Sequence, residues 1–231
     1  MTGMNDMHMK DMHTKDKRVM QPSILSFAND LANICSLAGL FSAVLAIYFA
    51  ILGNFPAAMI GLVWAVFFDW SDGNIARRMK GRTDDQRTFG GQMDSLIDIV
   101  SFGICPAVVL LSYGDFSPWF IPGAFIIAAA GVLRLSYFNV YGLAGKSSFQ
   151  GLAIDNNGIF LVLIFVINSF VSESSFTILL YITIVALAAL NVAPIRTPKL
   201  SSGSWYYAII LYTLVITLFF GWQLLKGISH A

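Results

Sequence analysis

Long apolar runs alternate with short polar breaks along most of the chain. Seven of these runs have the length of a membrane-spanning helix. They lie near residues 31–53, 56–78, 91–113, 118–141, 156–171, 175–194 and 204–225. The fifth and sixth runs are short for a full span. The pattern therefore predicts an all-α polytopic membrane protein, a bundle of about 6–8 transmembrane helices.

The region before the first apolar run is different in character. Residues 1–20 are polar and lack the apolar core of a signal peptide, so we expect a disordered tail there. Residues 20–30 fit either a short interfacial helix leading into the first span or a plain linker. Residues 21–231 contain no internal repeat or second linker, which predicts a single transmembrane domain.

Composition supports the membrane assignment. The chain is 57% hydrophobic and 12% charged, and its mean hydropathy is +0.71, far from the values of a soluble domain. Its two cysteines, Cys35 and Cys105, lie inside apolar runs and are expected to be buried rather than disulfide-bonded. The net charge of +1 says little about partners, and we expect no nucleic-acid partner.

The basic residues predict how the protein is oriented. If the N-terminus is inside, every Lys and Arg except Lys226 lies on the inner side of the membrane. The positive-inside rule then places the N-terminus and the long loops in the cytoplasm. We therefore expect an integral membrane protein, of the bacterial inner-membrane type, whose polar cluster faces the cytoplasm.

Four acids stand inside or at the mouth of the second and third spans: Asp69, Asp72, Asp94 and Asp98. A carboxylate in hydrocarbon costs several kcal/mol unless something neutralises it. With 3.6 residues per turn, the second span carries five residues on one face. These are Asp69, Asp72, Gly73, Ala76 and Arg77. Gly90, Asp94 and Asp98 share one face of the third span, so an antiparallel pair of helices would bring the acids together.

Such a cluster predicts a metal site. Converging carboxylates repel one another, and Mg²⁺ or Mn²⁺, with two ions expected, would remove that repulsion and bind substrate phosphates. Gly73 and Ala76 leave room for a ligand, and Arg77 offers a fork for a phosphate. Two alternatives are the proton or ion path of an ion-coupled transporter and a structural network of Asp–Arg pairs. A path needs acids spread across the membrane, whereas these lie at one end of two helices.

The same residues resemble the signature of the CDP-alcohol phosphatidyltransferase family, D-x2-D-G-x2-A-R followed by G-x3-D-x3-D, at all eight positions. The resemblance implies metal-dependent transfer of a phosphatidyl group from CDP-diacylglycerol to a small polar alcohol, with release of CMP, by a homodimer. It implies that Asp69, Asp72 and Asp94 bind metal. Asp98 would be the catalytic base and a further metal ligand. Asp69, Gly73, Ala76, Arg77 and Gly90 would bind the CDP-lipid. One departure is the spacer between Arg77 and Gly90, which has twelve residues and is longer than usual; its charged residues suggest a solvated loop.

Further runs resemble the phosphatidylserine synthases of that family. They are MDSLIDIVSFGICPA from Met93, RLSYFNV from Arg134, FQGLAIDNN from Phe149 and LNVAPIRTPKL from Leu190. Ile99 follows Asp98 where the glycerol-phosphate and inositol-phosphate branches usually carry Lys. Serine is therefore the favoured acceptor.

Three departures leave choline open as the alternative acceptor. Tyr137 replaces the second Arg of the serine pattern, and Ala153 and Asp155 replace two prolines. Tyr137 could hold a quaternary ammonium by cation–π contact, and the long spacer and Asn156–Asn157 resemble phosphatidylcholine synthases. Arg134, Tyr137 and Asn156 are thus candidates for binding the acceptor or a phosphate. The plainer alternatives are an interfacial anchor for Arg134 and an interfacial aromatic for Tyr137.

Overall fold

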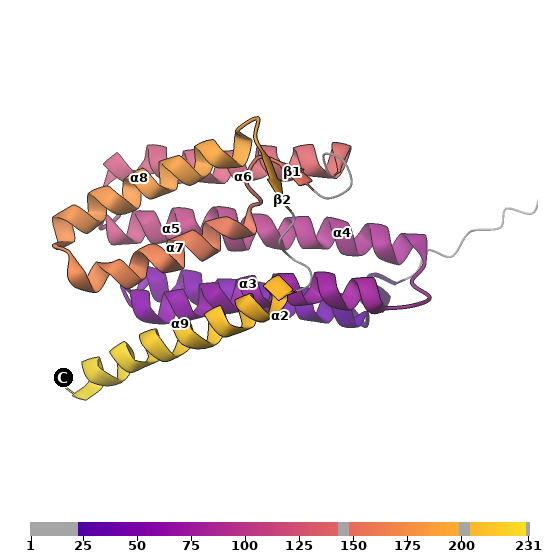
Figure 1. The fold of residues 1–231 in the computed structure, drawn as a ribbon, viewed down its shortest axis with the longest axis horizontal. Helices are drawn as coiled ribbons and strands as arrows, with labels where there is room; N and C mark the ends of the chain where they lie inside the picture. Colours follow the sequence, from indigo (N-terminus) through magenta and orange to yellow (C-terminus); the bar gives the residue numbers. More distant parts are fainter. Residues whose placement is uncertain (1–22, 143–147, 199–203, 230–231) are drawn as a thin grey trace, which may run out of the picture.

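The computed structural model describes residues 23–142, 148–198 and 204–229 (Figure 1). The tail expected over residues 1–20 lies outside them. The described chain is helical almost throughout, which confirms the all-α class. Its helices are α1 (Ile24–Ala28), α2 (Leu31–Ile51), α3 (Phe55–Arg78), α4 (Asp84–Asp98), η2 (Ile99–Ile104), α5 (Cys105–Tyr113), η3 (Pro118–Phe120), α6 (Ile121–Tyr141), α7 (Asp155–Ile167), η4 (Asn168–Phe170), α8 (Glu173–Val192) and α9 (Ser204–Ser229).

Each predicted span corresponds to one helix or to successive helices that continue one another. Among the described residues, five helical runs are long and apolar enough to cross a membrane: Leu31–Ile51, Asp84–Tyr113, Pro118–Tyr141, Glu173–Val192 and Trp205–Gly227. The run Asp155–Phe170 is apolar but shorter. Helix α3 has 24 residues, and its two acids lower its apolarity. The chain is therefore an integral membrane protein of several spans.

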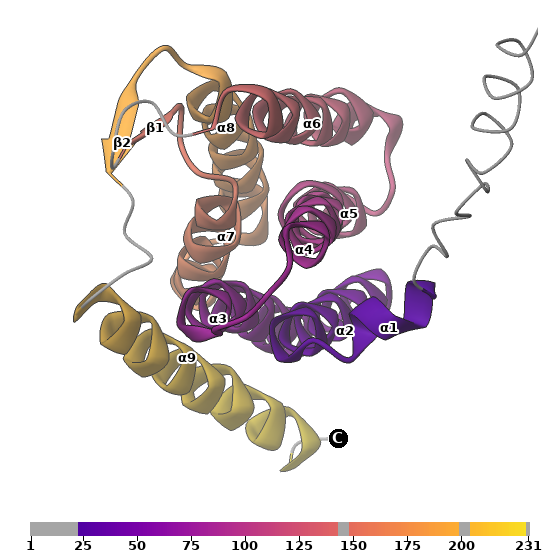
Figure 2. The ribbon, with the colours of Figure 1, turned by 90° about the vertical axis from the view of Figure 1, so that its right-hand side faces the viewer.

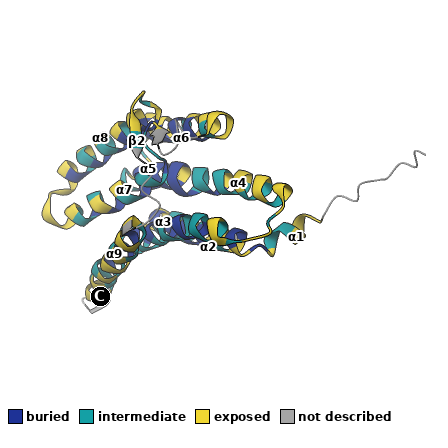
Figure 3. Cartoon of the chain, turned by 45° about the vertical axis from the view of Figure 1, so that its right-hand side comes forward, coloured by how far each residue is buried: buried dark blue, intermediate teal, exposed yellow. Residues whose placement is uncertain are grey.

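The outer surface agrees with this assignment. Figure 3 shows exposed residues along the outer faces of α8 and α9, and on α9 they include Leu211, Leu218 and Trp222. Large apolar side chains on the outside of a long helix suit a lipid environment, since lipid imposes no penalty on them. Helix α1 forms within residues 20–30, so that segment is a short helix rather than a plain linker. Its place at the membrane interface stays a prediction.

A central rod organises the bundle. Helix α4, the π-helical η2 and α5 run continuously from Asp84 to Tyr113. Viewed along its axis in Figure 2, this rod is surrounded by α2, α3, α7, α8 and α6, while α9 packs outside α3. The rod therefore places the third-span acids against side chains from several helices.

The predicted start of the third span at residue 91 was too late. Helix α4 begins at Asp84 because Thr83 and Gln86 form a reciprocal capping box, and Asp84 and Asp85 occupy the first turn. Most of the long spacer is therefore helix, and only a short loop joins α3 to α4.

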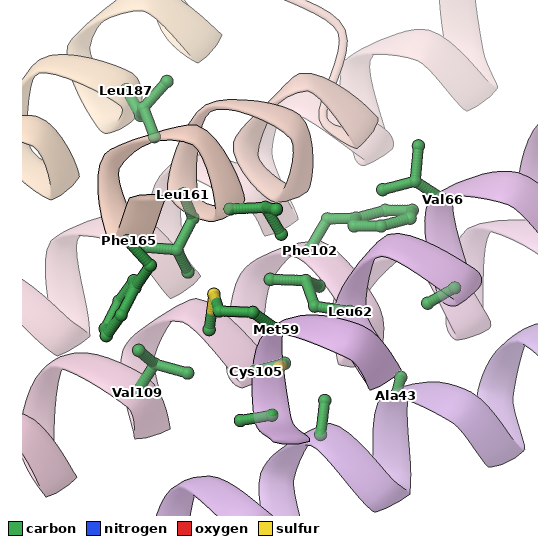
Figure 4. Close-up of a cluster of buried hydrophobic side chains, with 14 of the residues drawn as sticks. Ala43, Met59, Leu62, Val66, Phe102, Cys105, Val109, Leu161, Phe165 and Leu187 are labelled. Carbon is green, nitrogen blue, oxygen red and sulfur yellow. The ribbon is translucent and has the colours of Figure 1, made fainter. Parts of the chain in front are cut away.

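Small residues let α2 and α3 approach closely. A Cβ on Gly61 of α3 would lie 2.8 Å from the Ser42 carbonyl oxygen and 2.9 Å from the Ala46 nitrogen. Beyond this contact the core is apolar, and Figure 4 shows Met59 and Leu62 of α3 facing Phe102 and Cys105. Cys105 is buried, as expected, whereas Cys35 is only partly buried; neither forms a disulfide. This packing fixes α3 against the central rod.

A pair of short strands was not predicted. Strands β1 (Ser148–Gln150) and β2 (Arg196–Pro198) pair antiparallel, with Phe149 opposite Thr197. The Gly151 nitrogen donates to the Ile195 carbonyl beside them, 2.8 Å away. This pair joins the chain before α7 to the chain after α8.

Candidate active site

Helices α3 and α4 bring the motif acids together. Carboxylate oxygens of Asp69, Asp94 and Asp98 all lie within 4.8 Å of one another. Asp72 lines the same pocket. Ile97 and Phe102 supply apolar side chains to the lining of this pocket. Carboxylates from two elements therefore converge on one small volume.

Helix α2 supplies the partner of the most buried acid. The Ser36 hydroxyl donates a hydrogen bond to the Asp72 carboxylate, and both residues are buried. This bond fixes the orientation of Asp72 toward the other acids. Ser36 was not predicted as a site residue, because nothing in the local pattern of α2 indicates a partner on α3.

A larger cavity of about 210 Å³ adjoins the acids. Both pockets share Ser36, Asp72 and Asp94, so these residues form the common wall. The rest of the lining comes from α2, α3, the spacer and α4: Ala32, Asn33, Gly73, Ala76, Arg82, Arg87, Gly90 and Gly91. The small motif residues Gly73, Ala76 and Gly90 thus lie where a ligand beside the acids would meet the backbone.

Arg77 lies beside this cavity rather than inside its lining. Its guanidinium donates to Asn74 Oδ1 over 2.8 Å, and one of its nitrogens lies 3.4 Å from the place of a Cβ on Gly73. The side chain is exposed. Arg77 is therefore placed at the outer rim, next to the small residues of the motif.

The expectation of a solvated spacer is wrong for Arg82. Its Nε lies 2.7 Å from Asp30 Oδ2, with side chains only 9% and 3% exposed. Asp30 also caps α2 by accepting from the Ala32 nitrogen. A Cβ on Gly90 would lie 2.8 Å from Arg82 Nη2, so Gly90 makes room for this arginine. Arg82 folds inward because its partner lies far away in the sequence, where a local pattern cannot reveal it.

The π-helical segment η2 reshapes the rod immediately after Asp98. π-Helical turns often mark functional sites. Ser101 lines the acid pocket from this segment. Asn157 Nδ2 donates to the Phe102 carbonyl over 3.0 Å and to Asn191 Oδ1 over 3.0 Å. Ser101 was also missed, although its spacing of three residues from Asp98 and seven from Asp94 could have indicated it.

The acceptor candidates fall in different places. Arg134 is buried, its Nε donates to the Leu152 carbonyl over 3.0 Å, and its charge interacts first with Asp155 and then with Asp98. Asn156 bonds within its own turn, to the Ala153 carbonyl and to Asp155. Tyr137 is 42% exposed, and its ring centroid lies 4.7 Å from that of Tyr141. All three candidates therefore lie outside the lining of the two cavities, and they differ in that Arg134 is buried whereas Tyr137 is exposed.

The donor set fits a divalent cation. Mg²⁺ and related ions take oxygen ligands about 2.0–2.6 Å away, so oxygens up to about 4–5 Å apart can share one ion. The spacing of the Asp69, Asp94 and Asp98 oxygens meets this limit, and Asp72 adds a fourth carboxylate to the same wall.

Comparison with known proteins decides between enzyme and transporter. A family model described as CDP-alcohol phosphatidyltransferase matches residues 29–229. The chain belongs to the CDP-alcohol phosphatidyltransferase family. It is accordingly a transferase of phospholipid biosynthesis, and the resemblance predicted from the eight motif positions is confirmed. The ion-coupled transporter hypothesis loses its basis.

Individual relatives in the phosphatidyltransferase family are moderately similar. The chain is 36% identical over 170 residues to archaetidylserine synthase of Methanothermobacter thermautotrophicus, covering 73% of this chain and 70% of the relative. It is 33% identical over 145 residues to CDP-diacylglycerol--serine O-phosphatidyltransferase of Methanocaldococcus jannaschii, covering 62% and 64%. It is 30% identical over 175 residues to the Bacillus subtilis protein of that name, covering 70% and 90%.

Proposed function

We propose that this transferase moves a phosphatidyl group from CDP-diacylglycerol to the hydroxyl of L-serine, releases CMP, and requires Mg²⁺ or Mn²⁺. The observation that carries the proposal is the convergence of the Asp69, Asp94 and Asp98 oxygens within 4.8 Å at the wall of a cavity lined by small motif residues. This arrangement suits a diphosphate next to metal ions.

Some of the motif residues would bind the metal ions and others the CDP part of the donor. Asp69, Asp72, Asp94 and Asp98 would hold the ions, two being expected. When bound, the ions offset charge on the phosphoryl oxygens and on the leaving CMP. Gly73, Ala76 and Gly90, with Asp69, admit the CDP part close to the backbone, and Arg77 at the rim faces its phosphates.

Asp98 is the proposed general base. Its carboxylate takes the proton of the serine hydroxyl as that oxygen forms a bond to the phosphorus of the phosphatidyl group. The bond from that phosphorus to the oxygen of the CMP phosphate breaks, and CMP leaves with the electron pair. The apolar wall around Ile97 and Phe102 limits water near the base.

Serine is favoured over choline as the acceptor. The relatives above carry serine in their names. The position of Tyr137, exposed and with its ring tilted against that of Tyr141, removes much of the cation–π argument for choline. The names differ in the lipid, archaetidyl in one and diacylglycerol in the others, so the donor should be tested with both lipid types.

The proposal includes a location and an assembly. The acids and their cavity are taken to open to the cytoplasm, as the distribution of Lys and Arg indicates. The lipid tails of the donor would stay in the bilayer while its nucleotide stays in water. A homodimer is proposed on the family resemblance.

The test is CMP release by the purified protein with CDP-diacylglycerol and Mn²⁺. Serine, choline, glycerol 3-phosphate and inositol are supplied in parallel, and a CDP-archaeol donor is compared in a second series. We expect release that depends on serine. CMP release that depends on choline alone would overturn the choice of acceptor. No CMP release with any acceptor, together with no binding of either CDP-lipid, would overturn the enzyme assignment.

A further inference from the structure

A fifth carboxylate lies beside the four motif acids. Asp155 is the first residue of α7, and its Oδ2 accepts a hydrogen bond from Trp70 Nε1 over 2.7 Å. Trp70 directly follows Asp69 in α3. Arg134 Nε donates to the carbonyl of Leu152, three residues before Asp155. The negative charge of Asp155 interacts with Arg134 and with the acids Asp69 and Asp98.

The hydrogen bond from Trp70 does not by itself explain the charge of Asp155. The bond from Trp70 needs only an acceptor oxygen, which an asparagine would also provide. A further negative charge beside four carboxylates is unfavourable unless a cation compensates it, and Arg134 supplies such a charge. Asp155 and Arg134 therefore form two opposite charges beside the acids, which suit a ligand that carries both charges.

Two buried polar atoms nearby also lack a partner. Ser101 Oγ and Asn157 Oδ1 make no hydrogen bond within the described part of the chain, and the two residues are 1% and 0% exposed. Ser101 lines the acid pocket. Asn157 follows Asp155 by two residues in α7, and its Nδ2 donates to the Phe102 carbonyl of η2. Buried polar groups in native proteins are nearly always paired, so these two atoms point to a small polar ligand between η2 and α7.

We propose that Asp155 and Arg134 select the acceptor as an amino-acid zwitterion. The Asp155 carboxylate binds the ammonium of serine, and the Arg134 guanidinium, oriented by its bond to the Leu152 carbonyl, binds the carboxylate of serine. The inference rests on the proposed function, in which serine is the acceptor; Asp155 and Arg134 are the residues that would recognise serine.

The charges explain the choice among acceptors. A zwitterion brings one charge for each residue and leaves the site's net charge unchanged. Choline would place a cation beside Arg134 without a carboxylate to pair it. Glycerol 3-phosphate would place a phosphate beside Asp155, which repels it. The replacement of a family proline by Asp155 is then a specificity feature of this chain.

The test compares serine with 3-hydroxypropanoate, which is serine without its ammonium. CMP release gives kcat/KM for both acceptors in the wild-type protein, in Asp155→Asn and in Asp155→Glu. Asp115→Asn is the matched control, because Asp115 lies in the exposed turn after α5. The KM for CDP-diacylglycerol and the melting temperature are measured alongside.

We expect Asp155→Asn to lower kcat/KM for serine by about tenfold or more, the loss typical of a charge-assisted hydrogen bond. The value for 3-hydroxypropanoate should not fall, so the preference for serine collapses. Asp155→Glu, which keeps the charge, should retain a preference for serine even if its rate or stability drops.

Three results would count against the inference. Equal losses for both acceptors in Asp155→Asn, with serine still preferred, would show a structural role and overturn the assignment alone. Loss of the serine preference in Asp155→Glu as well would do the same. A wild-type protein that binds CDP-diacylglycerol but does not use serine would overturn the proposed acceptor and this assignment together.

Discussion

Asp98 is the proposed general base, so turnover is expected to depend on its carboxylate most directly. Asp98→Asn keeps the size and removes the base, so we expect turnover to fall by roughly 10²- to 10⁴-fold, the usual contribution of a general base. Stabilisation of the protein by CDP-diacylglycerol, measured as a shift in melting temperature, should remain largely intact. The control is Asp115→Asn. Near-normal turnover in Asp98→Asn would show that another group takes the proton.

At the residue scale, the sequence identified the acids because helical spacing alone places them on shared faces. Asp69 and Asp72 are three apart, and Asp94 and Asp98 are four apart. Ser36 and Asp155 were not predicted as site residues because their partners lie on another helix. Ser36 bonds to Asp72, and Asp155 accepts from Trp70. A one-dimensional pattern carries no signal for such partners.

At the scale of helices, the contact of α2 with α3 depends on Gly61. We expect Gly61→Ala to lower stability by about 1–3 kcal/mol, because the added methyl group meets the backbone of α2 and the helices must separate. The melting temperature of the detergent-solubilised protein measures this. Gly221→Ala in α9 is the matched control, since a Cβ there meets nothing within 4 Å. Equal effects of the two substitutions would contradict the close contact.

The Arg82–Asp30 pair joins the start of α4 to the start of α2. Removing one member of a buried pair typically costs about 3–5 kcal/mol, so Arg82→Ala should lower the melting temperature clearly more than Arg78→Ala, which changes an exposed arginine. Asp30→Asn keeps an oxygen to cap α2. In the double variant with Arg82→Ala, Asp30→Asn should lower the melting temperature by less than Asp30→Asn does in the otherwise unchanged protein. Fully additive effects would mean that the two side chains do not interact.

Helix positions were predictable because the backbone N–H and C=O groups of each apolar run must be hydrogen-bonded within the membrane, and a helix achieves this. The β1–β2 pair and the π-helical segment η2 were not predictable. Strands of three residues are too short to show alternation. A π-helical turn leaves the local sequence pattern unchanged, and here the side chain of Asn157 bonds to its Phe102 carbonyl.

At the scale of the whole molecule, the charge pattern predicts that the loop between α3 and α4 faces the cytoplasm and the turn after α5 faces outward. A membrane-impermeant maleimide should label Lys80→Cys only in inside-out vesicles and Trp119→Cys only in intact cells. The unsubstituted chain, with Cys35 and Cys105 partly or fully buried, gives the background. The reverse pattern would overturn the orientation and place the acids on the other side.

The measurement that tests the central claim most directly joins metal binding to turnover at the four acids. Mn²⁺ binding, followed by electron paramagnetic resonance, and CMP release with serine are measured on the same wild-type, Asp94→Asn and Asp115→Asn samples. We predict that Asp94→Asn weakens both together, that Asp115→Asn changes neither, and that EDTA abolishes release until Mn²⁺ is restored. Full release of CMP in the presence of EDTA, or unchanged Mn²⁺ binding in Asp94→Asn, would contradict the account.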